Sequence, residues 1–331
     1  MHGVVVGKFY PPHAGHKYLI GQAEATVDRV TVVLLANSRE SIPVGERHAW
    51  LQEIHPNVQV VSSVADHPID YDDASVWDLW EKEIRALCPE PIDLVFSSES
   101  YGDELARRLD AEHVPVDPNR AVVPISGTAV RADPAAHWND MEPCVRAWFV
   151  KRVCVLGAES TGTSTLAKAL ARHYEAECVP EYGRQYCEER RTWEPQWEWK
   201  TEHFLEIAVG QVRLEDDAAR RSGPILICDT DPLATSVWHE RYMNAPAPAL
   251  VELATRRRYD LYVLTGSDIP WVQDGTRDGE EVREWMTGRL REVLSERSVP
   301  FIEVTGSLEQ RLEVTIGSID RVVAGPWTLS G

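Results

Sequence analysis

The sequence predicts an α/β protein built from two tandem three-layer domains. Apolar, strand-like runs alternate with stretches long enough for helices, and this alternation occurs twice along the chain. Such a pattern is typical of parallel βαβ units, in which helices cover both faces of a sheet. A length of 331 residues is enough for two domains that each bury a core. We therefore expect one domain over residues 1–148 and a second over residues 149–331.

The expected strands follow one another in two series. The first series consists of "GVVVGKFY", "RVTVVLLAN", "VQVVSSVAD", "IDLVFSS" and "EHVPVD", with helices such as "ERHAWLQEIH" and "VWDLWEKEIRALC" between them. The second consists of "RVCVLG", "PILICDTD", "YDLYVLTG" and "VPFIEV". Between the series, Pro143 in "WNDMEPCVRAWFVKR" suits the first turn of a helix that leads into the strand at Arg152. We expect a short linker.

Composition disfavours several classes of protein. The chain has 53 acidic against 34 basic residues, and a net charge of −19 repels nucleic acid over most of the surface. The six cysteines show neither C-x-x-C nor the paired Cys/His spacing of zinc sites. The sequence contains no apolar run of about 18 residues, the length that a membrane helix needs. Its N-terminus lacks the charged and apolar regions of a signal peptide. We expect a cytoplasmic protein with no nucleic-acid or membrane partner.

The stretch "VLGAESTGTST" resembles a phosphate-binding P-loop between a strand and a helix. Its pattern is G-x-x-x-x-G-K-[ST], and Gly157 and Gly162 align with the two glycines. Ser164 then takes the metal-binding hydroxyl position, and Thr163 stands in place of the lysine. The nucleotide contacts expected in this loop are Gly157, Glu159, Ser160, Thr161, Gly162, Thr163, Ser164 and Thr165. The backbone amides can still cradle phosphates, but the positive charge of the loop is missing.

A second phosphate site is expected in the first domain. "GKFYPPHAGH" places His13 and His16 beside the start of a helix near His16, where backbone amides favour anions. "PISGTAVR" supplies Ser126 as the N-cap of another helix, with Arg131 one turn further on. Taken singly, the first motif could be a surface turn with incidental histidines and the second a plain capped helix.

Together these motifs resemble the G-x-F-x-P-x-H-x-G-H and I-S-x-T-x-x-R signatures of the nucleotidyltransferase superfamily. The resemblance implies a Rossmann-like domain that contacts ATP through Gly7, Lys8, Phe9, His13, Gly15, His16, Ser126, Thr128 and Arg131. Of these residues, His13, His16 and Arg131 would be catalytic. Mg²⁺ is expected to bridge the phosphates.

The whole chain resembles the bifunctional NadR-type family. "VFSSESYGDELA" and "VDPNR" extend the resemblance in the first half, and "EYGRQY", "CDTD", "WVQDGTRD" and "VPFIEV" extend it through the second. It implies adenylyl transfer from ATP to nicotinamide mononucleotide in the first domain, with "SSE" near the nicotinamide nucleotide. It also implies ATP-dependent phosphorylation of ribosylnicotinamide in a P-loop kinase-like second domain. Some members carry an N-terminal helix-turn-helix, for which the sequence before the first strand leaves no room.

The second site has further candidates around the P-loop. Asp229, which ends a buried strand, is the candidate for a catalytic base or metal-linked carboxylate, with Ser164 as the second Mg²⁺ ligand. The expected acceptor-binding residues are Glu181, Tyr182, Arg184, Trp193 and Asp231. Arg277 and Arg283 are expected in a lid that closes on the transferred phosphate. Each candidate also has a purely structural interpretation. Asp229 could belong to an ordinary turn at the end of a strand, and Glu181 and Arg184 could form an ion pair at a helix N-terminus. Trp193 could serve helix packing, and the two arginines could be solvated.

The substitution at Thr163 leaves two hypotheses for the second domain. In the first, it is a ribosylnicotinamide kinase in which a lid arginine replaces the lysine. In the second, only the first domain is an enzyme, and the P-loop domain is a nucleotide-binding regulatory or assembly module. In either case the partners are small molecules, and the oligomeric state, a homo-oligomer included, stays open.

Overall fold

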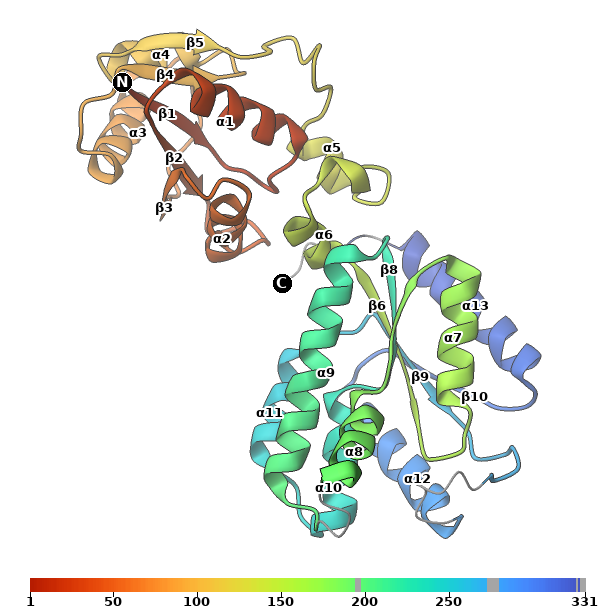
Figure 1. Cartoon of the computed structure of the whole chain (residues 1–331). Helices are drawn as coiled ribbons and strands as arrows, with labels where there is room; N and C mark the ends of the chain where they lie inside the picture. Colours follow the sequence, from red (N-terminus) through yellow and green to blue (C-terminus); the bar gives the residue numbers. More distant parts are fainter. Residues whose placement is uncertain (194–197, 273–279, 326, 328–331) are drawn as a thin grey trace. The chain divides into compact units, whose positions relative to one another are not determined.

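The computed structural model describes residues 1–193, 198–272, 280–325 and 327, with the side chains of 191–193 excepted. The chain divides into two compact units, one spanning Met1–Phe149 and joined by Trp327, the other spanning Val150–Pro326 (Figure 1). The division falls one residue after the predicted boundary. Helix α6 (Pro143–Phe149) begins at the predicted proline and ends the first unit. No helix among the described residues has the length and apolar character needed to cross a membrane.

The first unit is built on a five-stranded parallel sheet with the order β3-β2-β1-β4-β5. Its strands are β1 (His2–Gly7), β2 (Arg29–Ala36), β3 (Gln59–Val64), β4 (Leu94–Ser97) and β5 (Glu112–Pro115). The chain runs outward from β1 to β3 and then returns to β4 on the other side of β1. Such a reversal leaves a crevice at the carboxyl ends of β1 and β4, where ligands bind in open α/β sheets.

Helices cover both faces of this sheet. They are α1 (Ala14–Thr26), α2 (Val44–Ile54), α3 (Ala74–Leu87) and α4 (Gly102–Arg108), followed by the short α5 (Gly127–Ala132) and a 3₁₀ turn (Trp138–Asp140). Val5 packs in one core cluster with Ile20 of α1, whereas Val4 packs in another with Ile84 of α3. Successive side chains of a strand point to opposite faces, so the sheet is buried on both sides.

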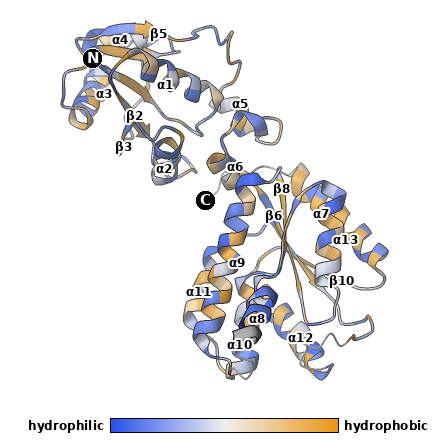
Figure 2. Cartoon of the chain, in the orientation of Figure 1, coloured by the Kyte–Doolittle hydropathy of each residue, from blue (hydrophilic) through white to orange (hydrophobic). Residues whose placement is uncertain are grey.

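The second unit contains another five-stranded parallel sheet, with the order β10-β9-β6-β8-β7. Its strands are β6 (Lys151–Gly157), β7 (Glu177–Val179), β8 (Ile225–Asp229), β9 (Leu261–Thr265) and β10 (Phe301–Val304). Figure 2 shows strands of hydrophobic colour in both units beside helices of mixed colour. Burial on both faces explains why these strands read as nearly continuous apolar runs.

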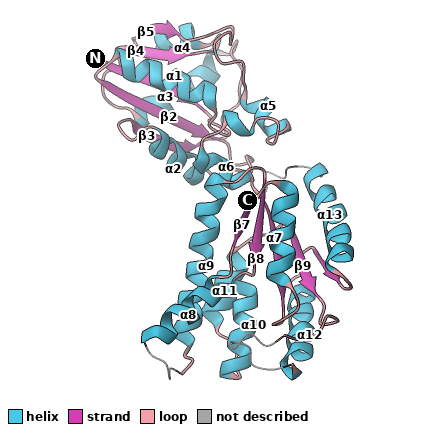
Figure 3. Cartoon of the chain, turned by 45° about the vertical axis from the view of Figure 1, so that its right-hand side comes forward, coloured by secondary structure: helices cyan, strands magenta, loops and turns pink. Residues whose placement is uncertain are grey.

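The helices of the second unit form the outer layers (Figure 3). They are α7 (Thr163–Tyr174), α8 (Tyr182–Trp193), α9 (Thr201–Arg221), α10 (Pro232–Met243), α11 (Pro248–Arg256), α12 (Glu281–Glu296) and α13 (Leu308–Ala324). Leu170 of α7 and Ile319 of α13 share a core cluster with Val153 of β6. The predicted fold class, α/β with two three-layer units, is therefore confirmed.

Candidate active sites

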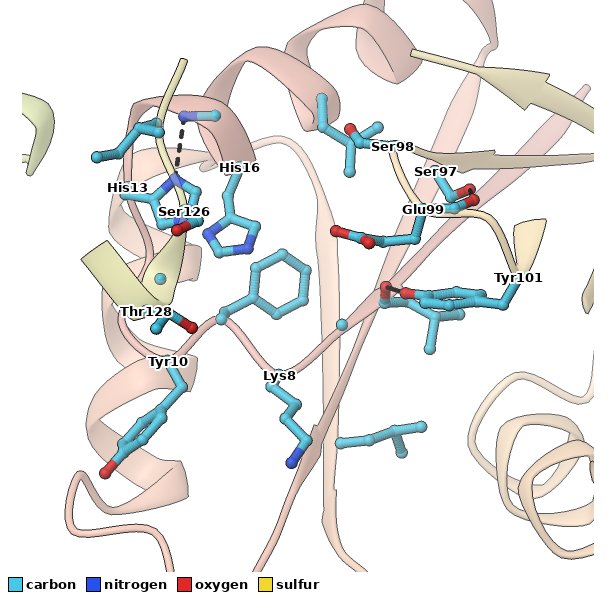
Figure 4. Close-up of a pocket in the computed structure, with 18 of the residues that line it drawn as sticks. Lys8, Tyr10, His13, His16, Ser97, Ser98, Glu99, Tyr101, Ser126 and Thr128 are labelled. Carbon is cyan, nitrogen blue, oxygen red and sulfur yellow. Dashed lines mark hydrogen bonds between the residues drawn. The ribbon is translucent and has the colours of Figure 1, made fainter. Parts of the chain in front are cut away.

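A cavity of about 670 Å³ opens at the carboxyl ends of β1 and β4 in the first unit (Figure 4). The first-domain residues expected to contact a nucleotide all line it: Gly7, Lys8, Phe9, His13, Gly15, His16, Ser126, Thr128 and Arg131. They come from the end of β1 and the loop after it, from the start of α1, and from α5 with its N-cap. Ser97, the last residue of β4, and Glu99, which follows the strand, line the opposite side. The fold thus brings both halves of the predicted signature to one cavity.

The two histidines form a closely packed pair. Helix α1 begins at Ala14, two residues before His16, near which the sequence predicted its start, and its N-cap is His13. The Nδ1 atom of His13 accepts the N–H of Gly15 at 3.1 Å, and the two imidazole rings lie 3.8 Å apart. A neutral His13 with Nδ1 as acceptor carries its proton on Nε2, which is then free to donate.

Both imidazoles are held in the neutral form. Burial, together with the charge of Arg120, lowers the pKa of His13 to about 4. Burial, with His13 and Arg120 beside it, also holds the pKa of His16 well below its usual value. The Nδ1 atom of His16 is buried without a hydrogen-bond partner. The pair is therefore a neutral hydrogen-bonding surface at pH 7, and it needs no counter-ion.

Arg131 joins the second signature to the first. Its Nη1 donates to the carbonyl oxygen of Tyr10 at 2.6 Å, and its Nη2 donates to Oγ1 of Thr128 at 3.1 Å. Ser126 is the N-cap of α5, as predicted, and its hydroxyl accepts the N–H of Ala129 at 3.2 Å. Lys8 is the other predicted cation, and it lies 3.1 Å from Glu40.

The second unit has its own cavity, of about 480 Å³, at the mouth of the P-loop. The predicted loop residues that line it are Gly157, Glu159, Ser160, Gly162, Thr163, Ser164 and Thr165. Thr161 does not line it: its hydroxyl donates to the carbonyl oxygen of Ala158 at 2.6 Å and lies 2.7 Å from the hydroxyl of Thr265. The Thr161 side chain therefore supports the loop from within the core, which leaves the backbone N–H of this residue for the predicted nucleotide contact.

Asp229 occupies the position predicted for it, and Asp231 does not. Asp229 ends β8, lines the cavity and accepts a hydrogen bond from Ser164. Burial raises its pKa, against that hydrogen bond and the charges of Lys168 and Arg184. Asp231 is fully buried as the N-cap of α10, where it accepts from the N–H of Ala234 and the hydroxyl of Tyr262. Its assignment to the acceptor is corrected: it is a structural cap.

The acceptor-side residues are only partly brought together. Glu181 and Arg184 line the cavity, 3.9 Å apart. Tyr182 is not among the lining residues, because its ring lies over Gly210 of α9 and its N–H donates to Gln211 at 2.9 Å. The side chain of Trp193 lies outside the described residues. Trp199 does line the cavity, with its ring 4.5 Å from that of Phe204.

The structure describes only one of the two predicted lid arginines. Arg277 lies outside the described residues. Arg283 belongs to α12 and is only 3% exposed, so it is not a lid residue. Its Nη2 donates to the backbone oxygens of Ser160, Ser267 and Ile269, at 3.3, 3.1 and 2.9 Å. Arg283 therefore lies behind the P-loop, in contact with the backbone of the loop.

Comparison with known proteins gives one match within the second unit and others that cover most of the chain. Residues 152–311 match the family model described as an AAA domain. The NadR protein of Salmonella typhimurium, described as a trifunctional NAD biosynthesis/regulator protein, is 30% identical over 324 residues, which cover 91% of this chain and 78% of that protein. The chain belongs to the NadR family. Its Escherichia coli member is 29% identical over the same shares of both chains.

Solved NadR structures have the same fold as this NadR-family chain. A NadR protein in complex with NAD and AMP-PNP gives a TM-score of 0.77 at 22% identity, covering 98% of this chain and 96% of that one. A NadR protein in complex with NR gives 0.78 at 21% identity, over the same shares. The resemblance inferred from the motifs is confirmed.

In this NadR-family chain, the first cavity also contains an arginine that the motif reading did not single out. Arg120 lines the cavity, and its guanidinium lies 3.0 Å from Glu99. Its loop turns around Asp117, whose carboxylate accepts the backbone N–H groups of Ala121, Val122 and Val123. The sequence feature that could have indicated Arg120 is "VDPNR", in which an aspartate and an arginine share one short loop.

A serine, a histidine and an aspartate form a hydrogen-bonded chain at the edge of the same cavity. The hydroxyl of Ser97 lies 2.9 Å from Nε2 of His113, whose Nδ1 lies 2.7 Å from Asp103. A Cβ atom at Gly102 would lie 2.1 Å from that Nε2, so only glycine permits the contact. The segment "SSE" is thus held in place from behind, through residues that no motif identified.

Arg311 of α13 is the second cavity's unpredicted neighbour. It is 3% exposed, and its Nη1 donates to the carbonyl oxygen of Thr161 at 2.6 Å. Its Nη2 bonds to the carboxylate of Asp268 at 2.7 Å. Two buried guanidinium groups, those of Arg283 and Arg311, therefore contact consecutive carbonyls of the P-loop. No sequence pattern indicates this, because Arg311 belongs to the helix farthest along the chain.

Proposed function

We propose that the first unit transfers the adenylyl group of ATP to nicotinamide mononucleotide, giving NAD and pyrophosphate. The observation that carries the proposal is the convergence of His13, His16, Ser126 and Arg131 in one cavity. The family members described as NAD biosynthesis proteins, and a NadR protein solved with NAD and AMP-PNP, support the same substrates.

The reaction brings two anions together and needs no covalent enzyme intermediate. The phosphate of the mononucleotide attacks the α-phosphorus of ATP, and pyrophosphate leaves. Neutral His13 and His16 donate hydrogen bonds to the triphosphate, and Arg131 offers a guanidinium to the leaving β- and γ-phosphates. Catalysis then rests on positioning and on stabilisation of charge.

The adenylyltransferase proposal is tested by NAD formation from ATP and nicotinamide mononucleotide. His16→Ala is expected to lower turnover by about 10²–10³-fold, as for the removal of other transition-state donors. His48→Ala is the matched control, since His48 bonds Ser62 and is not among the residues that line the cavity. Equal turnover of His16→Ala and the unmodified protein would refute the assigned site.

For the second unit we propose ATP-dependent phosphorylation of ribosylnicotinamide. Asp229 ends β8 at the P-loop cavity, where a carboxylate can accept the proton of the attacking hydroxyl. A NadR protein solved with NR supports a ribosylnicotinamide-like acceptor. The same carboxylate can instead be a metal ligand beside Ser164, which is the other role predicted for it.

The second cavity fits Mg²⁺ bound jointly by protein and substrate. Ser164 and Asp229 place a hydroxyl and a carboxylate in hydrogen-bond contact, and both are oxygen donors of the kind Mg²⁺ prefers. Among the described residues, no group of three or more His, Cys, Asp or Glu side chains could hold a metal alone. Bound with ATP, the ion would supply positive charge to the phosphates. Ser164 and Asp229 would hold it in place.

One observation favours a second candidate function for this unit, a nucleotide-binding regulatory or assembly module. Thr163 lines the cavity where the P-loop lysine belongs, and a hydroxyl cannot replace a full charge. Supplying ribosylnicotinamide, ATP and Mg²⁺ and measuring the mononucleotide decides between the two. Steady formation of the mononucleotide would exclude the hypothesis of a regulatory or assembly module. Nucleotide binding without formation of the mononucleotide would exclude the hypothesis of a kinase.

A further inference from the structure

The described lining of the second cavity is poor in positive charge. Its acidic side chains are Glu159, Glu181 and Asp229, and its basic side chain is that of Arg184, which lies 3.9 Å from Glu181. Lys168 of α7 is exposed and is not among the lining residues. Among the described lining residues, acidic side chains therefore outnumber basic ones, so a cation outside this set would stabilise a bound polyphosphate.

Behind the P-loop, two buried guanidinium groups face its backbone. Arg283 donates to the carbonyl oxygen of Ser160 at 3.3 Å, and Arg311 donates to that of Thr161 at 2.6 Å. Each carbonyl shares a peptide unit with the next N–H of the loop. A cationic donor on the carbonyl side polarises that unit and makes its N–H a stronger donor toward an anion.

The two arginines differ in the charge that accompanies them. Arg311 is paired with the carboxylate of Asp268 at 2.7 Å, so its charge is neutralised. Arg283 bonds three backbone oxygens and, within the ranges that the structure describes, no carboxylate. Its Nε is buried without a partner. Among the residues that the structure describes, no carboxylate therefore neutralises the positive charge that Arg283 places under the loop.

We propose that Arg283 does the work of the missing lysine from behind the P-loop. It is a positioning residue: its charge acts on a bound polyphosphate through the peptide unit that joins Ser160 to Thr161. A guanidinium suits this role because it stays charged when buried and its fork fixes it to several carbonyls at once. The inference rests on the proposal that the second cavity binds ATP, and it adds the source of the positive charge.

A purely structural role for Arg283 makes a different prediction. In that case Arg283 stabilises the P-loop by linking it, through hydrogen bonds, to the backbone oxygens of Ser267 and Ile269. Arg283→Lys keeps the charge and loses the fork, whereas Arg283→Met keeps similar bulk and loses the charge. Restoring a lysine in the loop by Thr163→Lys replaces charge but no backbone contact. These three changes separate the two roles.

The test uses the full chain with Arg131→Met, which disables the first cavity, and measures the Kd of a fluorescent ATP analogue with Mg²⁺. Arg283→Met is expected to raise this Kd about tenfold and Arg283→Lys less than about threefold, since charge is what is replaced. Adding Thr163→Lys to Arg283→Met should bring the Kd back. Arg289→Met is the control, because Arg289 lies on the same helix and is paired with Glu240.

Equal weakening by Lys and Met at position 283, or no recovery on adding Thr163→Lys, would overturn the inference in favour of a structural brace. If Arg283→Met does not fold by circular dichroism, Arg283→Gln takes its place in the same series. A parent protein that binds no nucleotide would overturn the ATP-binding proposal and this inference together. Tight binding by the parent and an unchanged Kd for Arg283→Met would overturn this inference alone.

Discussion

The guanidinium of Arg131 lies over the ring of Tyr10, 4.8 Å from its centroid, while its Nη1 holds the carbonyl oxygen of Tyr10 at 2.6 Å. One side chain thus connects the start of α5 to the loop after β1. These segments lie far apart in the sequence, and the cavity exists only when they meet. The contact fixes the direction of the guanidinium before a substrate arrives.

Arg131→Lys keeps the charge and loses the planar fork that bonds Tyr10 and Thr128 together. We expect NAD synthesis to fall by about 10²-fold, because a lysine cannot reproduce the orientation of a preorganised donor. Steady-state kinetics with ATP and nicotinamide mononucleotide check this. Arg107→Lys, a change at an exposed arginine of α4, is the control. Near-normal turnover of Arg131→Lys would show that charge alone suffices.

The two aspartates at the end of β8 are expected to respond oppositely to substitution. Asp231→Ala removes a buried N-cap and leaves the hydroxyl of Tyr262 unpaired, so the free energy of unfolding should fall by about 1–3 kcal/mol.

Asp229→Asn removes a carboxylate whose charged form burial disfavours, so it should leave stability unchanged or raised while abolishing phosphorylation of ribosylnicotinamide. Urea unfolding of both variants is the measurement. Loss of stability in Asp229→Asn and none in Asp231→Ala would reverse the assignment of these two residues.

The buried histidine pair predicts a pH dependence of stability. The pKa of His13 is about 4 in the folded chain, below the ordinary value of 6.5, so the unfolded chain binds a proton first as pH falls. The stability contributed by neutral His13 is complete above pH 6.5 and is lost progressively toward pH 4. The loss is about 3 kcal/mol for this group, from about 1.4 kcal/mol per pKa unit.

His13→Gln should therefore flatten the fall in unfolding free energy over this pH range, when it is compared with the unmodified protein. Because other groups titrate in both proteins, the difference between the two curves is the quantity to measure, by denaturant unfolding at several pH values. Parallel curves would mean that folding does not lower the pKa of His13, contrary to this prediction.

Gly157 is expected to tolerate no side chain. A Cβ atom there would lie 2.1 Å from Oγ1 of Thr265 and 2.7 Å from Oγ1 of Thr161, both of which are buried. Gly157→Ala should lower the free energy of unfolding by about 1–3 kcal/mol and weaken ATP binding in the second cavity. Gly223→Ala is the control, since nothing lies within 4 Å of its Cβ position. Melting curves of the two variants should differ clearly.

The sequence was informative where a residue's neighbours in the chain are also its neighbours in space. Ser126 caps the helix that follows it, and Gly157 to Ser164 form a loop of local geometry, so short motifs predicted their positions. Asp231 and Tyr182 were misassigned for the opposite reason. Each stands beside a site residue in the sequence, but the periodicity of its element turns its side chain toward the core or toward α9.

No short sequence motif identifies residues that contact a site from a helix distant in the sequence. Arg283 and Arg311 act on the P-loop from α12 and α13, and their roles depend on which backbone carbonyls lie within reach. An arginine in an amphipathic helix reads as a solvated charge until the packing of that helix is known. That these side chains are buried and bond the backbone of the P-loop could therefore be seen only in the folded structure.

The two sheets have the same number of strands and similar layers, yet their strand orders differ. In the first unit the second strand of the series, β2, lies next to the central β1, whereas in the second unit β7 lies at the edge and β8 separates it from β6. The two units therefore share an architecture but not a topology, so an assignment of site residues in one unit cannot be carried over to the other by strand position.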